Sequence, residues 1–209
     1  MVLKNKLGIT KDSELAYIEE EMSKKKALEL FEKGLLETFE VGTFKGLSDI
    51  HQYLFGDIYD FAGKVRDVNI SKGNFRFAPA LYLDAALKNI SKMPQSTFDE
   101  IIKKYVEMNV AHPFREGNGR SIRIWLDVIL KRELKRVVDW SKINKEDYLL
   151  AMERSPIRDV EIRFLLESAL TDQIYNREVY MKGIDASYDY EGYNIFKIEN
   201  LKGICSPSP

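Results

Sequence analysis

The segment from His112 to Arg123, with the sequence HPFREGNGRSIR, constrains the fold more than any other part of this chain. Pro113 cannot lie inside the helix that precedes it, because it lacks an N–H and its ring clashes with the turn before it. The two glycines that flank Asn118 allow backbone angles that are closed to other residues. The segment is therefore predicted to be a loop that leaves His112 at the end of one helix and starts another near Asn118 or Gly119.

Helical periodicity surrounds this loop on both sides. Thr97 followed three residues later by Glu100 forms a capping box for the helix that runs to Ala111. Apolar residues at helical spacing follow the loop, at Ile122 and Trp125 among others. Similar patterns predict a helical pair at 11–41, broken near Gly34, and further helices at 47–61, 81–90, 144–152 and 160–170. The predicted fold class is all-α, a helical bundle.

One stretch departs from the helical pattern. Residues 68–78 alternate apolar and polar side chains around Lys72-Gly73-Asn74, which is typical of a short β-hairpin with a glycine-containing turn. A hairpin of this kind could instead be a surface feature that only covers the core.

The amino-acid composition limits which partners the protein can bind and in which cellular compartment we expect it. The 209 residues include 32 basic and 33 acidic side chains, a balance that disfavours direct binding of nucleic acid through its backbone. Cys205 is the only cysteine, so neither an intrachain disulfide nor a cysteine metal cluster is expected. The sequence has no signal-peptide pattern and no long apolar run. We expect a cytoplasmic protein with no membrane partner.

The loop combines groups that suit a phosphate site. His112 has a reference pKa near 6.5 and is a candidate general base. The amides of residues 117–119, at the start of a helix, form a candidate anion site. Arg120 and Arg123 lie on one face of that helix and can hold phosphate oxygens. Glu116 can bind Mg²⁺, which needs only one or two carboxylates beside the phosphates.

Each of these parts has a structural reading as well. A Gly-Asn-Gly triplet is often only a turn, paired arginines often form a solvated face, and Phe114 is expected to fill the core. His51, in an earlier helix, is expected to be a structural histidine. The combination within one short loop is what favours chemistry.

The loop also carries a resemblance. His112-Pro-Phe-Arg-Glu-Gly-Asn-Gly-Arg120-Ser-Ile-Arg123 resembles, without departure, the HPFx(D/E)GNGRxxR signature of the Fic (filamentation induced by cAMP) family. The upstream segments LSDIHQYLFGDIYDFAGKVR and NISKGNFRF are also similar to the first helices and the β-hairpin flap of that family. The resemblance implies the Fic fold and a protein adenylyltransferase, which moves AMP from ATP to a hydroxyl of a target protein.

The resemblance also implies roles for individual residues. His112 would deprotonate the hydroxyl, and Glu116 would hold Mg²⁺ on the α- and β-phosphates. Gly117, Asn118 and Gly119 would cradle the same phosphates, Arg120 would reach the β/γ end and Arg123 the γ-phosphate. Lys72, at the tip of the flap, would also touch the nucleotide. The target protein would add an extended segment to the flap as a strand.

A second family pattern, (S/T)xxxE(G/N), is matched near the end of the chain by Ser187, Glu191 and Gly192. It resembles the inhibitory helix of the single-domain class, in which Glu191 would pair with Arg123 in place of the γ-phosphate. The resulting division is a catalytic domain at 1–182, an inhibitory helix at 183–195 and a disordered tail at 196–209. Tyr188 and Tyr190 are candidate self-modification sites. The same segment could be a helix that merely completes the core.

Alternative functions remain open at this point. One is a Fic-fold phosphotransferase or a transferase of another nucleotide, although the phosphotransferase branch has a lysine where Gly119 stands. Another is a catalytically silent regulatory binding module, against which the complete catalytic set argues. The sequence also leaves a homo-oligomer open.

Overall fold

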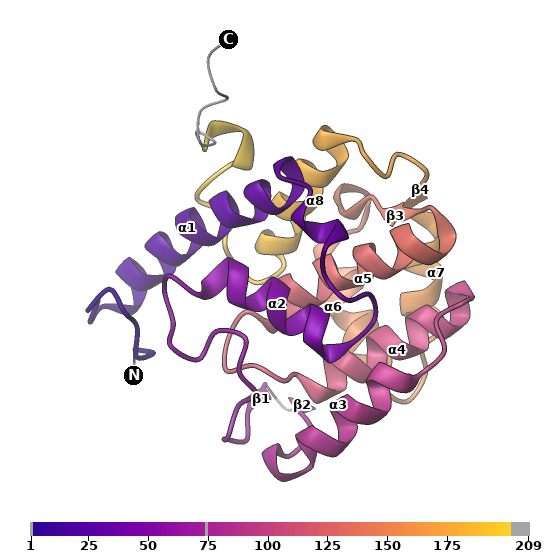
Figure 1. Cartoon of the computed structure of the whole chain (residues 1–209), viewed down its shortest axis with the longest axis horizontal. Helices are drawn as coiled ribbons and strands as arrows, with labels where there is room; N and C mark the ends of the chain where they lie inside the picture. The colour runs from indigo at the N-terminus through magenta and orange to yellow at the C-terminus, as the bar shows by residue number, and fades with distance from the viewer. Residues whose placement is uncertain (1, 74, 202–209) are drawn as a thin grey trace.

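The computed structural model describes residues 2–73 and 75–201 (Figure 1). The helices are α1 (Asp12–Glu32), α2 (Phe44–Phe55), α3 (Leu83–Lys92), α4 (Phe98–Ala111), α5 (Asn118–Leu134), α6 (Lys145–Arg154), α7 (Val160–Ser168) and α8 (Arg177–Asp189). The strands are β1 (Ser71–Lys72), β2 (Phe75–Arg76), β3 (Val137–Val138) and β4 (Leu170–Thr171). The expected all-α bundle with a short hairpin is confirmed.

The core is built around α5, which packs against α2, α4 and α8 (Figure 1). Its apolar residues, Trp125 and Ile129 for example, are fully buried, and residues on nearly every side of the helix are inaccessible. A helix enclosed on all sides must find partners for any charge that it carries. Arg120 and Arg123 are buried near its start, so each of them needs a fixed partner. Within the described residues, no helix combines the length and the apolar character needed to cross a membrane.

The helix before the loop begins as the capping box predicted. Thr97 Oγ1 accepts a hydrogen bond of 3.3 Å from the backbone N–H of Glu100, and Glu100 Oε2 accepts one of 3.1 Å from the N–H of Thr97. The helix ends at Ala111, one residue before His112. The positions of both ends of the loop therefore follow from local sequence.

The N-terminal prediction of a helical pair at 11–41 is wrong. The chain forms one long helix, α1, followed by a single 3-10 turn at Leu35–Glu37. Gly34 between them has φ of 64°, a left-handed conformation that ends the α-helix. No second α-helix forms between this turn and the start of α2 at Phe44.

The hairpin predicted at 68–78 is present, with strands shorter than its pattern indicated. Ser71 pairs with Arg76 and Lys72 with Phe75 in antiparallel register. Asn74, in the predicted turn, lies outside the described residues. A second two-stranded sheet, β3 with β4, was not predicted, because its two-residue strands meet only once the helices between them have folded.

The C-terminal boundaries also differ from the prediction of an inhibitory helix at 183–195. Asn176 caps α8 by accepting from the backbone N–H of Glu178 and Val179, so the helix starts earlier and ends at Asp189. Glu191 lies in the turn beyond it, before Gly192 at φ of 88°. The tail was expected to be disordered from 196 onward, but Ile198 is buried. Residues 202–209 lie outside the described residues.

Candidate active site

The side chain of Asn118 fixes the loop between α4 and α5 by binding the backbone of Phe114. Asn118 Oδ1 accepts from the backbone N–H of Phe114 at 2.8 Å, and its Nδ2 donates to the carbonyl of Phe114 at 2.8 Å. Phe114 is fully buried and stacks on His51, with ring centroids 3.8 Å apart. The side chain of Asn118 therefore has a structural role in this loop. The backbone amides at the start of α5 remain the phosphate donors that this loop can offer.

Two contacts fix the ring of His112. Its Nδ1 lies 3.1 Å from the carbonyl oxygen of Asn109, and its ring stacks on Phe77 of the flap at 3.7 Å. Because a carbonyl only accepts, Nδ1 carries the proton and Nε2 keeps a free lone pair. Burial lowers the pKa of His112 to about 4. The imidazole is therefore neutral near pH 7 and able to accept a proton.

His51, the other histidine, has a structural role, as predicted. Its Nε2 lies 2.8 Å from the carbonyl oxygen of Glu116, and its Nδ1 accepts from the backbone N–H of Gly63 at 2.9 Å. Nε2 therefore fastens the loop to α2, and Nδ1 fastens the segment that follows α2. Burial lowers the pKa of His51 to about 3, which keeps this ring neutral.

Arg123 pairs with Glu191, as the C-terminal pattern implied, and also with Ser187. Its Nε donates to Ser187 Oγ at 2.7 Å, and its Nη2 donates to the Ser187 carbonyl at 2.7 Å and to Glu191 Oε1 at 3.0 Å. The second carboxylate oxygen of Glu191 accepts from Lys72 Nζ at 3.1 Å. Burial would raise the pKa of Glu191, but the charges of Arg123 and Lys72 outweigh it and lower that pKa to about 2.

The carboxylate of Glu191 lies directly over Gly119. A Cβ built on Gly119 would come within 2.2 Å of Glu191 Oε1, so no other residue fits there with Glu191 in place. The N-terminal turn of a helix, with its free amides and positive dipole end, is where an anion is favoured. The carboxylate of Glu191 thus lies at the first turn of α5, where an anion is favoured.

Arg120 is committed to side chains of the fold. Its Nη1 lies 2.7 Å from Glu19 of α1 and its Nη2 lies 3.1 Å from Glu116, while its guanidinium covers the rings of Phe55 and Tyr193. Arg120 therefore has a buried structural role, and its predicted contact with the β/γ end of the nucleotide stays a prediction. The sequence carried a signal for Glu19, since it occupies a position in the apolar stripe of α1.

Glu116 is the carboxylate available to a metal ion. Its side chain is 39% exposed, and its Oε1 also accepts from the backbone N–H of Gly117 at 2.9 Å. Among the described residues, no group of three or more His, Cys, Asp or Glu could hold a metal by itself. A lone carboxylate beside an anion site fits Mg²⁺, which takes its remaining ligands from phosphate oxygens and water.

These groups meet in one open pocket of about 680 Å³, within the usual size of a ligand site. The flap forms one wall, and residues 148–156 at α6 form another. The pocket is lined by every residue predicted to serve catalysis, nucleotide binding or metal binding, together with Glu191: Lys72, His112, Glu116, Gly117, Asn118, Gly119, Arg120, Arg123 and Glu191. The structure thus brings the predicted site residues together.

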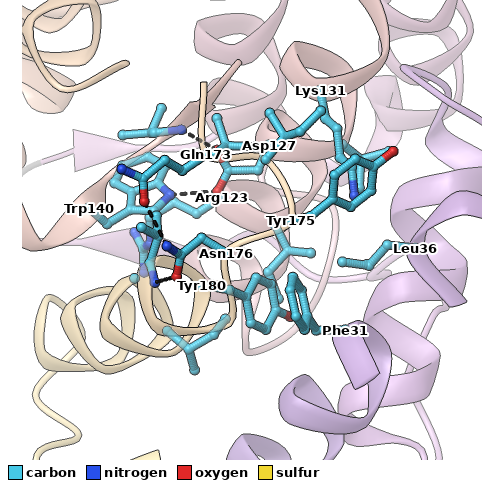
Figure 2. A pocket seen from close by; sticks show the side chains of 18 of the residues that line it. Phe31, Leu36, Arg123, Asp127, Lys131, Trp140, Gln173, Tyr175, Asn176 and Tyr180 are labelled. Carbon is cyan, nitrogen blue, oxygen red and sulfur yellow. Dashed lines mark hydrogen bonds between the residues drawn. The ribbon is translucent and has the colours of Figure 1, made fainter. Parts of the chain in front are cut away.

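A second pocket of about 260 Å³ is lined by Arg123 and Ser187 and lies between α5 and α8 (Figure 2). Figure 2 shows Asp127 beside Trp140, whose Nε1 donates to the carboxylate at 2.8 Å. The backbone N–H of Val138 donates to the other carboxylate oxygen, also at 2.8 Å. Burial raises the pKa of Asp127 to about 7. This carboxyl group fastens the chain after α5 to the helix.

The two tyrosines proposed as self-modification sites are buried. Tyr188 is fully inaccessible and Tyr190 is 4% exposed. The hydroxyl of Tyr190 donates to the carbonyls of Trp140 and Ile143, at 3.0 and 2.9 Å. In this arrangement neither hydroxyl can reach a nucleotide, so their modification requires that the end of α8 first open.

The chain is similar to known proteins over much of its length. Residues 43–130 match the model of the Fic/DOC family. The chain is 29% identical to protein adenylyltransferase VbhT of Bartonella schoenbuchensis over 93% of its own length, which spans 45% of VbhT. It is 30% identical to the probable protein adenylyltransferase y4lH of Sinorhizobium fredii, over 74% of this chain and 83% of y4lH.

The fold is also shared with a solved structure. BepC from Bartonella tribocorum, crystallised with bound AMPPNP, aligns with a TM-score of 0.66 and 22% identity over 82% of this chain and 93% of that one. The match with y4lH covers most of both proteins, and the family model includes the whole loop and α2. The chain belongs to the Fic/DOC family.

Proposed function

We propose that this protein transfers AMP from ATP to a hydroxyl group of a target protein and releases pyrophosphate. One observation carries the proposal: the free Nε2 of His112 and the anion site at the start of α5 line the same pocket. The names of VbhT and y4lH and the AMPPNP bound to BepC support the same reaction and the same nucleotide. Because the chain spans less than half of VbhT, the activity is proposed here on the site of this chain.

The reaction needs a base because a hydroxyl is a weak nucleophile. The hydroxyl oxygen attacks the α-phosphorus, the bond from that phosphorus to the bridging oxygen breaks, and pyrophosphate departs. The hydroxyl proton moves to Nε2 of His112, which Asn109 holds in the required tautomer. The low pKa of His112 keeps it neutral before the reaction, so no proton must first be removed.

The rest of the site positions and neutralises charge. The amides of the first turn of α5 would bind phosphate oxygens, and Arg123 would bind the γ-phosphate with the guanidinium face that now holds Glu191. Glu116 would hold Mg²⁺, which when bound offsets the negative charge of the phosphates. Arg120 would contribute its charge to the phosphates while Glu19 fixes its position. Preorganised charge of this kind is the main source of rate in phosphate chemistry.

The flap would receive the target. Its strands are short, and Ser71 and Lys72 are exposed. An extended segment of a target protein could pair with this edge through main-chain hydrogen bonds and place its hydroxyl next to His112, which the flap covers through Phe77.

We further propose that Glu191 inhibits the enzyme by occupying Arg123. A guanidinium edge cannot bind a carboxylate and a phosphate at the same time. With Glu191 in place, ATP either fails to bind or binds with its phosphates displaced from His112. The turn that carries Glu191 would therefore be the regulatory element of this protein.

Labelled ATP tests the proposed reaction. The Glu191→Gly form, incubated with a cell lysate, should transfer label from α-labelled ATP and none from γ-labelled ATP. The same form with His112→Ala should lose about 10²- to 10⁴-fold in rate, the usual contribution of a general base, while its melting temperature stays unchanged. Transfer of the γ label would indicate a phosphotransferase instead. No transfer of either label would indicate a binding module.

A further inference from the structure

Arg66 is a buried charge that the proposed reaction does not use. It lies between α2 and the flap, is 5% exposed, and directs its guanidinium at backbone carbonyls. Nε donates to the carbonyl of His112 at 2.8 Å, and Nη2 to that of Ala111 at 3.1 Å. Nη1 donates to the carbonyl of Val68 at 2.6 Å, and Nη2 also to that of Ala78 at 2.5 Å.

The first pair of acceptors belongs to the catalytic loop. The carbonyls at the end of α4 have no partner within the helix, because the next residues leave the helical path. His112 has φ of 47°, a left-handed conformation that is unfavourable for a residue with a side chain. A strained residue of this kind persists only where its surroundings hold it. Arg66 supplies two such bonds, and its own backbone N–H donates to the carbonyl of Pro113 at 2.8 Å.

The second pair of acceptors lies at the two ends of the flap. Val68 precedes β1 and Ala78 follows β2, so one guanidinium joins both arms of the hairpin. Phe77, next to Ala78, is the ring on which the imidazole of His112 stacks. The guanidinium of Arg66 therefore holds both the backbone of His112 and the flap segment whose Phe77 ring contacts the imidazole.

We propose that Arg66 is a positioning residue that holds the His112 imidazole and the flap in a fixed relation, so that the base and a hydroxyl presented on the flap meet at the α-phosphate. The proposal rests on the proposed adenylyl transfer. Arg is suited to this role because its planar fork reaches several acceptors in fixed directions, whereas Lys donates from a single atom. Within the described residues, the hydrogen bonds of the Arg66 side chain all go to these backbone carbonyls.

Kinetics of Arg66→Lys in the Glu191→Gly form test this role. Transfer of AMP should slow by about 10²-fold, because a displacement near 1 Å of a reacting group costs that much. Affinity for AMPPNP, measured by calorimetry, should change by less than about twofold, because Arg66 is outside the phosphate site. Arg158→Lys, a change of the same kind at an exposed arginine, is the matched control and should leave both quantities unchanged.

A spectroscopic measurement separates positioning from a loss of fold. The chain has two histidines, so their Cε1–H signals can be assigned by comparison with His112→Ala. In Arg66→Lys the His112 signal should shift and titrate closer to its reference pKa near 6.5, since the ring leaves its buried place beside Phe77. The charges that face His112 are Glu191, Lys72 and Arg66 itself. The His51 signal should stay unchanged.

Two results would overturn the proposal. One is a transfer rate in Arg66→Lys that matches the Arg158→Lys control. The other is a slow variant in which the His112 signal is unchanged, or in which both histidine signals move together, because the loss would then have another origin. If the variants do not fold, exchange of the Arg66 Nε–H in the unmutated protein decides: a clamped group exchanges slowly, and fast exchange refutes the clamp.

The same measurements distinguish this proposal from the proposed function. If the Glu191→Gly form transfers no label from ATP, the proposed function fails. The position of the His112 signal and the exchange of the Arg66 N–H report the clamp without any turnover.

Discussion

Replacement of Glu191 by glycine is the perturbation with the largest expected gain in activity. Glu191 is held between Arg123 and Lys72, at 3.0 and 3.1 Å. Its pKa is lowered from 4.5 to about 2, which corresponds to roughly 3 kcal/mol in favour of the charged carboxylate in this site. If removal of the carboxylate frees Arg123 for the nucleotide, the rate should rise by roughly 10- to 10²-fold, because a hydrogen bond to a charged group contributes about 1.5 to 3 kcal/mol and each 1.36 kcal/mol is a factor of ten.

The contact of Glu191 with Arg123 depends on pH in a direction that favours comparing the two forms near pH 7. The pKa of Glu191 is lower in the folded protein than in the unfolded chain, so its contribution is fully present above about pH 4.5. That contribution is lost only as the pH falls toward about 2. At pH 7 the inhibitory contact is therefore at full strength, and the difference between the two forms is greatest.

The assay is incorporation of α-labelled AMP into lysate protein at a fixed ATP concentration, with calorimetry of AMPPNP binding alongside. Glu191→Gln is the matched control, because it keeps the size of the side chain and one acceptor oxygen but loses the charge. We expect a smaller increase for it than for Glu191→Gly. If Glu191→Gly labels no faster than the unmutated protein while its melting temperature is unchanged, the competition for Arg123 is not what limits the enzyme.

Three further outcomes follow from the structure. The rate of the Glu191→Gly form should stay flat from pH 8 down to about pH 5, because burial keeps the pKa of His112 low; an acidic limb near pH 6.5 would show that the ring is solvated. Replacing Thr97 by alanine should lower stability by about 1 kcal/mol through loss of the helix cap, a change that denaturant unfolding can measure. Lys24→Ala should cost about 3 to 5 kcal/mol, since it leaves the carboxylates of Glu20 and Asp185 without their buried partner, each 3.0 Å away; a loss below 1 kcal/mol would mean that this pair is solvated.

The sequence by itself determined the elements whose signals are local. Pro113 ends the helix before the loop, Thr97 and Glu100 start that helix, and the glycines at 117 and 119 admit a tight approach. These signals depend on backbone angles and on neighbouring hydrogen bonds, which a few consecutive residues fix. The loop, the position of His112 at its start and the helix that follows were therefore predicted correctly.

The ends of segments that depend on distant contacts could not be predicted from the local sequence. The chain beyond α8 was expected to be disordered from 196, yet Lys24 of α1 donates to the carbonyl of Phe196 and also pairs with Asp185. No local pattern at 196 records a partner in the first helix. The β3–β4 sheet has the same origin, since two-residue strands have no periodicity of their own.

The partners of the buried charged side chains were likewise decided by distant contacts. The pairing of Glu191 with Arg123 was expected only through a resemblance, and the structure brings the two together across 68 positions of sequence. The sequence predicted none of three other contacts. These are the pairing of Arg120 with Glu19, the hydrogen bonds of Asn118 across the loop, and the hydrogen bonds of Arg66 to four carbonyls. A side chain's type shows that it needs a partner when buried, but only packing decides which atoms come within reach. The sequence thus determined which groups can carry out the chemistry, and the tertiary structure decided which are free to do so and which hold the others in place.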